Sequence, residues 1–142
     1  MFTHNSEQTL DVYRHTEAVA YFNNAIPQGF DQPGPYDLTG KTVSCYVYLP
    51  SELIASGDPQ AYVRLFVKDQ SFHNQYGTAL DITSELSEKW NLLSLVVGEG
   101  DIDPNFDSTK TNALGVRIEL QNWAALQFEG QIYIDECEIE HP

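Results

Sequence analysis

Aromatic and charged side chains alternate with aliphatic ones in three segments of the sequence, Thr42–Leu49, Ala61–Lys68 and Leu114–Gln121. Because successive side chains of an extended chain point to opposite faces, each segment predicts one aliphatic face and one mixed face. The mixed faces carry Tyr46, Tyr48, Arg64, Phe66, Lys68, Arg117, Glu119 and Gln121, and Trp123 joins them if the extended backbone continues that far. These groups are suited to noncovalent binding of a ligand. The alternative is an ordinary surface with strand-favouring aromatic residues.

Catalytic motifs are absent from the sequence. It has no G-x-S-x-G, G-x-x-x-x-G-K or G-x-G-x-x-G, so it predicts no nucleophile elbow and no phosphate cradle. The histidines are dispersed, and no pair of the 21 acidic residues stands out as a general acid and base. We therefore predict that the chain is not an enzyme.

Oxygen-bearing side chains alternate in Asp101–Asp107, as they do in calcium-binding loops. The pattern is not an EF-hand, because Phe106 stands where glycine is needed and Asn112 stands where a bidentate glutamate is expected. Asp, Asn and Pro are common turn residues, so we predict a polar turn here.

Length and charge restrict the partners. The 142 residues predict one domain spanning 1–142, and 42% of them are hydrophobic, enough for a core. Seven Lys and Arg against 21 Asp and Glu give a net charge of −14, which disfavours nucleic acid and anionic membranes and favours a soluble monomer. No apolar run is long enough to span a membrane, and no secretion signal is visible.

The two cysteines, Cys45 and Cys137, are far apart in the sequence. They are too few for a thiolate zinc site or a disulfide-dense scaffold. Two interpretations remain open: one bridge across the fold, or two small buried thiols.

Period-two hydrophobic patterns recur between clusters of turn residues, which is typical of an all-β domain. The expected strands are Thr9–Tyr13, Glu17–Asn23, Thr42–Leu49, Ala61–Lys68, Asn91–Val97, Leu114–Gln121 and Gln131–Ile139, with shorter ones at Thr78–Asp81 and Ala125–Phe128. The proline-rich segment Ile26–Tyr36 predicts a loop, and Ser51–Ser56 a single helical turn. We predict a two-sheet antiparallel β-sandwich.

Five segments in order resemble non-catalytic carbohydrate-binding modules: Asp37–Pro50, Ala61–Asp69, Trp90–Leu95, Leu114–Ile118 and Gly130–Asp135. The resemblance is to modules of the galactose-binding-like β-sandwich (jelly-roll) group, which are appended to secreted bacterial enzymes that degrade polysaccharides. It implies an extracellular module of a secreted protein. It also implies a concave sheet that binds a glycan chain, most simply a β-linked glucan or mannan.

The resemblance implies that the mixed faces form a sugar-binding groove. Aromatic rings would cover the apolar C–H faces of sugars, and the charged and carboxamide groups would bind hydroxyls. The loop Ser71–Gly77 would add a rim formed by Phe72, His73, Asn74 and Tyr76. The alternative is an ordinary hairpin loop with a tucked Phe. Two alternatives are a protein-interaction or adhesion domain that uses the same patch, and a module for an acidic glycan bound by Arg64, Lys68 and Arg117.

The sequence departs from such modules at the N-terminus. They usually have a further strand before the segment matching Leu10–Tyr13, but only nine residues precede that segment here. Three alternatives are open for this strand: it is missing, shortened or supplied otherwise. No cofactor is required. The resemblance nevertheless implies a possible structural calcium ion bound through Asp135, whose usual partners come from that N-terminal region.

Overall fold

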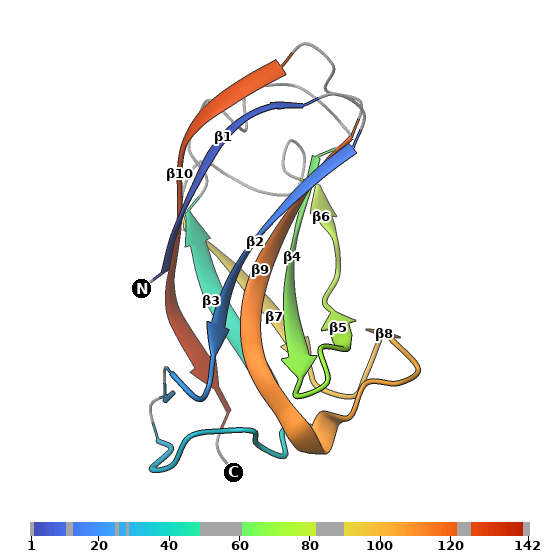
Figure 1. Ribbon diagram of the computed structural model, residues 1–142. Coiled ribbons are helices and arrows are strands. Elements are labelled where there is room, and N and C mark those ends of the chain that lie inside the picture. Colours follow the sequence, from blue (N-terminus) through green and yellow to red (C-terminus); the bar gives the residue numbers. More distant parts are fainter. Residues whose placement is uncertain are drawn as a thin grey trace.

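The computed structural model describes residues 2–10, 13–24, 26–27, 29–48, 61–81, 90–121 and 126–140, and these form two antiparallel sheets (Figure 1). One sheet, the β10–β3 sheet, has the order β1 (Phe2–Leu10), β10 (Leu126–Ile139), β3 (Thr42–Tyr48) and β7 (Trp90–Val96). The other, the β9–β4 sheet, has the order β2 (Tyr13–Tyr21), β9 (Thr111–Gln121), β4 (Ala61–Asp69), β5 (Asn74–Tyr76) and β8 (Asp101–Ile102). The short strand β6 (Leu80–Asp81) also pairs with β4, and the 3-10 helix η1 (Ser108–Lys110) precedes β9.

Aliphatic residues at alternate positions of β3, β4 and β9 fill the space between the sheets. Val43, Val47, Val63, Leu65, Val67, Val116 and Ile118 are all buried, as the alternation predicted. β-Branched residues favour strands because they pack well on a half-buried pleated surface. The predicted two-sheet β-sandwich is therefore confirmed.

The predicted strand boundaries were wrong at the N-terminus. The expected strand Thr9–Tyr13 does not exist as one element, because β1 ends at Leu10 and β2 begins at Tyr13. The first strand that the resemblance left in doubt is present: β1 pairs along its whole length with β10.

The other expected segments differ less from the observed elements. Within the shorter expected strand Ala125–Phe128, residues 126–128 belong to β10, and Ala125 lies outside the described residues; the longer expected strand Gln131–Ile139 lies wholly within the same β10. Within Ile26–Tyr36, the described residues form the predicted loop, in which Gly34–Pro35 is a cis peptide. The helical turn expected at Ser51–Ser56 lies outside the described residues.

Cys45 and Cys137 form a disulfide across a sequence separation of 92 residues. The interpretation of one bridge is therefore confirmed. The bridge joins β3 to β10, which are neighbours in one sheet, so it lies within a sheet and not between the two layers. Cys45 is buried in the core, and the bridge links two elements that are remote in the chain. Closing so long a loop restricts the unfolded chain and thereby stabilises the folded one.

Replacing both cysteines with alanine is expected to lower the free energy of unfolding by about 2–5 kcal/mol, because the unfolded chain regains the entropy that the loop closure removed. Urea denaturation of C45A/C137A beside the oxidised wild type measures the difference. Adding reductant should destabilise the wild type and leave the double variant unchanged. Equal stability of the two proteins would contradict this role for the bridge.

Candidate functional site

The predicted site residues lie on two different surfaces. Tyr46 and Tyr48 belong to β3 and lie on the outer face of the β10–β3 sheet. Arg64 and Arg117 belong to β4 and β9 and lie on the outer face of the β9–β4 sheet. Since the core separates the two outer faces, the prediction that three neighbouring strands converge in one groove was wrong.

Cross-strand register groups the polar residues of the β9–β4 sheet. Glu17 of β2 pairs with Arg117, and Arg117 pairs with Arg64 of β4. Residues that are directly paired point to the same face, so these three side chains form one row across three strands. Two like charges side by side destabilise a sheet unless they are compensated, so this row requires acidic partners.

The two guanidinium groups have those partners. Nη1 of Arg117 donates to Oε1 of Glu17 at 3.1 Å, and its Nε lies 3.0 Å from Oε1 of Glu119. Nε of Arg64 lies 3.6 Å from the same Glu119 oxygen. All four side chains are largely shielded from solvent, so screening by salt is weaker than at an open surface.

The ring of Tyr76, in β5, lies close to both arginines. The guanidinium carbons of Arg64 and Arg117 lie 5.2 and 5.5 Å from the centre of its ring, within the range of cation–π attraction. Its hydroxyl oxygen accepts from Nη1 of Arg117 at 3.2 Å and from Nδ2 of Asn74 at 3.1 Å. We define Glu17, Arg64, Tyr76, Arg117 and Glu119 as the arginine–tyrosine cluster.

Phe66 cannot stack on a ligand, so the prediction that it supplies a sugar platform was wrong. Its side chain is 0% exposed, although it lies on the outer face of the sheet. It pairs with Gly115, where an added Cβ would lie 2.4 Å from the ring, so the ring occupies the space that glycine leaves. The Tyr76 ring is 5.9 Å away and Lys68 Nζ lies 5.7 Å from the Phe66 ring centre, so Phe66 supports the cluster.

The rim residue Phe72 is presented to solvent, as the resemblance implied. Its side chain is 67% exposed and its backbone has φ 69°, a left-handed conformation that is uncommon for a bulky residue. The turn closes where the Phe72 N–H donates to the carbonyl of Asp69 at 3.1 Å. Such conformations persist only where the surrounding structure holds them.

Asp69 holds this turn, although it is only 2% exposed. Its Oδ1 accepts from the backbone N–H groups of Ser71 and His73, and its Oδ2 accepts from that of Asp107, each at 2.9 Å. His73 Nδ1 lies 3.2 Å from Oδ2. Burial raises the pKa of Asp69, but hydrogen bonds from Asp107, His73 and Ser71 outweigh burial, so the pKa lies below its ordinary value.

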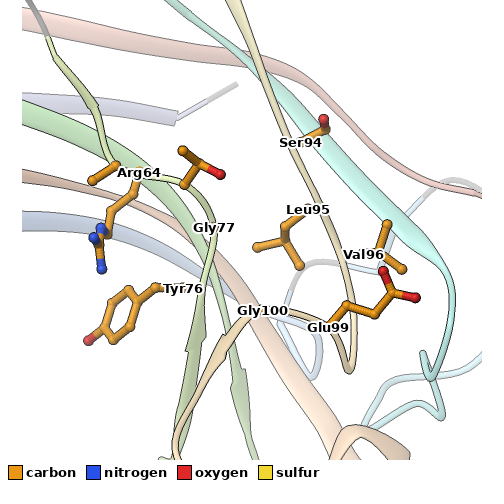
Figure 2. A pocket seen from close by; sticks show the side chains of 10 residues that line it. Arg64, Tyr76, Gly77, Ser94, Leu95, Val96, Glu99 and Gly100 are labelled. Atoms are coloured by element: carbon orange, nitrogen blue, oxygen red, sulfur yellow. The ribbon is translucent and has the colours of Figure 1, made fainter.

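A pocket of about 430 Å³ opens beside the cluster, between β5 and the edge strand β7 (Figure 2). Figure 2 shows Arg64 and Tyr76 on one side of the pocket and Ser94, Leu95, Val96 and Glu99 on the other. Its volume lies within the range of small-molecule sites.

Buried Gln75 fixes the two walls of the pocket to each other. Its Nε2 donates to the carbonyls of Val96 and Glu99 at 2.8 and 2.6 Å, and its Oε1 accepts from the Gly98 N–H at 2.8 Å. Gln75 belongs to β5 next to Tyr76, whereas its partners belong to β7 and the turn that follows it. The width of the pocket is therefore set by a satisfied polar contact.

Four further predictions have different outcomes. Gln121 ends β9, and Trp123 lies outside the described residues. Asp103 closes the predicted polar turn by accepting from the Asn105 N–H at 2.8 Å. Asp135 of β10 pairs with Tyr46 of β3. The described part of the chain contains no group of three His, Cys, Asp or Glu placed to hold a metal, so calcium at Asp135 stays a prediction.

Sequence reasoning missed Trp90 and Leu92. β7 begins at Trp90, one residue before the expected strand, and Trp90 and Leu92 pair with Tyr48 and Tyr46. Trp90 is 44% exposed, and its ring centre lies 5.6 Å from that of Tyr48. We define Tyr46, Tyr48, Trp90 and Leu92 as the aromatic patch. Alternation within Trp90–Val96 would have revealed it.

Comparison with known proteins rests on structure. No family model and no curated protein matches the sequence. A solved structure described as the xylan-binding module CBM15 is similar, with a TM-score of 0.51 and 15% identity over 97% of this chain and 95% of that one. A second is Xylanase10C from Cellvibrio japonicus in complex with xylopentaose, with a TM-score of 0.48 and 15% identity over 95% of this chain and 28% of that one.

The likeness to the xylan-binding module shows that the two chains share a fold, and that fold is the β-sandwich expected of a carbohydrate-binding module. Assignment to the galactose-binding-like group stays a prediction. Among the described residues, no helix is long and apolar enough to cross a membrane.

Asp69→Asn is expected to destabilise the protein by about 1.5–3 kcal/mol at pH 7, because an amide cannot replace both accepting oxygens. The folded-state pKa lies below the ordinary 3.8, so the contribution of the carboxylate is complete above that value and is lost as the pH falls through the folded-state pKa. The gap in unfolding free energy between wild type and variant should therefore narrow in acid.

Urea denaturation between pH 7 and pH 2.5 measures this gap. Asp31→Asn, in the exposed loop before β3, is the matched control and should track the wild type throughout. A gap for Asp69→Asn that does not change with pH would show that the ionised carboxylate is not the stabilising group.

Proposed function

We propose that this chain is a non-catalytic carbohydrate-binding module that binds a β-linked polysaccharide on the outer face of the β9–β4 sheet. The observation that most supports this proposal is the arginine–tyrosine cluster, in which a ring and several hydrogen-bonding groups are held at fixed positions beside a pocket. Sugars present apolar C–H faces and equatorial hydroxyls, so a binding surface needs both kinds of group. The fold shared with a xylan-binding module supports this choice.

Xylan is the first ligand to test, because the structural neighbour is described as xylan-binding. The sequence resemblance favoured a β-linked glucan or mannan, and these remain the comparison ligands. Hydrogen bonds to charged groups contribute about 1.5–3 kcal/mol each, and an aromatic contact about 0.5–1.5 kcal/mol. After the ordering costs of binding, a few such contacts give dissociation constants of about micromolar to millimolar.

The cluster is better arranged for binding than for hydrolysis. A glycosidase needs one carboxyl group as proton donor and another as nucleophile or base. Here both candidate carboxyl groups, Glu17 and Glu119, are ion-pair partners of the same Arg117, at 3.1 and 3.0 Å. We therefore propose no catalytic role for them, and the proposed function requires no cofactor.

We further propose that the module works outside the cell, as an accessory domain of a secreted glycoside hydrolase. The disulfide between Cys45 and Cys137 supports this location, since such bonds persist in oxidising compartments. The net charge of −14 supports a monomer, because copies of the chain repel one another.

The aromatic patch supports a second candidate function, an interaction surface for a protein partner. Trp90, Leu92 and Tyr46 are exposed large residues on paired strands. Contiguous exposed apolar residues mark interaction sites more often than plain surface. The aromatic patch and the cluster lie on opposite outer faces, so substitutions in one or the other distinguish the two candidate functions.

Tyr76→Ala is expected to weaken xylan binding at least tenfold, because it removes the ring and the hydroxyl that order both arginines. Isothermal titration calorimetry with xylo-, manno- and β-gluco-oligosaccharides measures the affinities, and thermal melting confirms that the variant is folded. Trp90→Ala, on the other outer face, should bind within twofold of the wild type.

If Trp90→Ala weakened xylan binding and Tyr76→Ala left it unchanged, the glycan site would lie on the aromatic patch. Absence of binding to every polysaccharide by the folded wild type would overturn the proposed function and favour a protein partner.

A further inference from the structure

We propose that the pocket beside the cluster is a subsite for a neutral branch, a single uncharged sugar attached to the bound polysaccharide chain. This inference rests on the proposed function and adds the class of substrate. Arg64 and Tyr76 belong both to the cluster and to the lining of the pocket (Figure 2). A branch that leaves a chain on the outer face at this point would therefore meet the pocket.

An interruption in the edge of the β9–β4 sheet forms one wall of this pocket. Both β5 and β6 pair with β4, through Tyr76 with Phe66 and Leu80 with Val63. Three residues, 77–79, lie between these pairs at the edge, whereas two residues, 64–65, lie between them in β4. The extra residue interrupts the ladder as a β-bulge does, and bulges are common at sheet edges and beside functional sites. All three residues of the interruption line the pocket.

The size and lining of the pocket suit a sugar residue. Its volume is about 430 Å³, which falls in the range for small ligands. Tyr76, Leu95 and Val96 offer apolar surface for the C–H groups of a sugar. Thr78 and Ser94 add hydroxyl groups, and these two side chains make no hydrogen bond to another described residue, so they can bind the hydroxyls of a ligand.

The two walls of the pocket are joined before a ligand arrives. Buried Gln75 connects β5 to the end of β7 and to the turn that follows it, with three hydrogen bonds of 2.6–2.8 Å. A branch that enters the pocket therefore does not have to order these walls, and less of its binding free energy is lost to ordering.

The charges around the pocket favour an uncharged ligand. Within the cluster, the guanidinium groups of two arginines face the carboxylates of Glu17 and Glu119, so two positive groups meet two negative ones. Arg64 already has partners in this group, and a neutral branch needs no ion pair with it. The other charged residue of the lining is Glu99, which accepts hydrogen bonds from hydroxyls and repels carboxylates. A neutral sugar supplies hydroxyls and carries no acid.

The test compares oligosaccharides of one backbone length, with and without a single neutral branch, by isothermal titration calorimetry. The pairs are xylo-oligosaccharides with an arabinose branch, manno-oligosaccharides with a galactose branch and β-gluco-oligosaccharides with a xylose branch. On the backbone that binds, the wild type should bind the branched ligand about tenfold more tightly than the linear one. Added salt should leave this ratio unchanged, because neither ligand is charged. A uronic acid branch should bind more weakly than the neutral one.

Two variants address the pocket itself. Ala79→Phe, in the interruption between β5 and β6, should bring the ratio to about one, because the larger side chain takes the space of the branch. Glu99→Gln should lower the ratio about twofold to threefold, since an amide oxygen is a weaker acceptor than a carboxylate. Thermal melting confirms that each variant is folded, and Glu99→Gln keeps the test decisive if Ala79→Phe does not fold.

Glu138→Gln is the matched control. It removes one exposed negative charge from β10, in the other sheet, and its ratio should equal that of the wild type. A ratio near one in the wild type would overturn the subsite, as would a ratio that Ala79→Phe and Glu99→Gln both leave unchanged. A uronic acid branch that binds as tightly as the neutral one would also overturn it.

The outcomes separate this inference from the proposed function. Binding of the linear chain without preference for the branch would remove the subsite and keep the module. Absence of binding to every ligand would remove both.

Discussion

Each sheet of the sandwich has only one face that is not committed to the core, and this constraint decides which side chains can act together. Alternate valines in β3 and β4 turn inward, so the residues between them must face outward on opposite sides of the molecule. On the β9–β4 sheet, register then places Arg64 directly opposite Arg117. Two adjacent cations need acids and ring faces close by, and Glu17, Glu119 and Tyr76 supply them. The cluster is thus a consequence of strand pairing.

Alternation predicts the face of a residue, but it does not predict the sheet to which a strand belongs. The inward residues of β3, β4 and β9 were predicted correctly, because they depend only on the geometry of a single strand. The separation of Tyr46 from Arg64 depends on strand order, which is set by contacts between segments remote in sequence. Trp90 was missed for a smaller reason: the predicted strand began one residue late, so its outward face was not considered.

Phe66 shows a second limit of sequence reasoning. The pattern correctly placed it on the mixed face of β4, yet its exposure depends on the residue across from it. Gly115 leaves a space on β9, and the Phe66 ring fills that space beneath Lys68 and Tyr76. The disulfide is similar, since two cysteines 92 residues apart can be paired only after the register of β3 and β10 is known. Both features are properties of pairs of strands.

The short strand β5 owes its position to two buried polar residues. Asp69 orders the turn before it by accepting from the N–H groups of Ser71 and His73, and it ties this turn to the N–H of Asp107. Gln75 within β5 binds the turn after β7. Buried polar groups stabilise and rigidify a structure only when their hydrogen bonds are satisfied, as they are at both residues. Tyr76 follows Gln75 directly, so its ring is held by contacts formed during folding. The entropy of ordering this part of the surface is therefore lost on folding and not on ligand binding, which favours affinity from a small number of contacts.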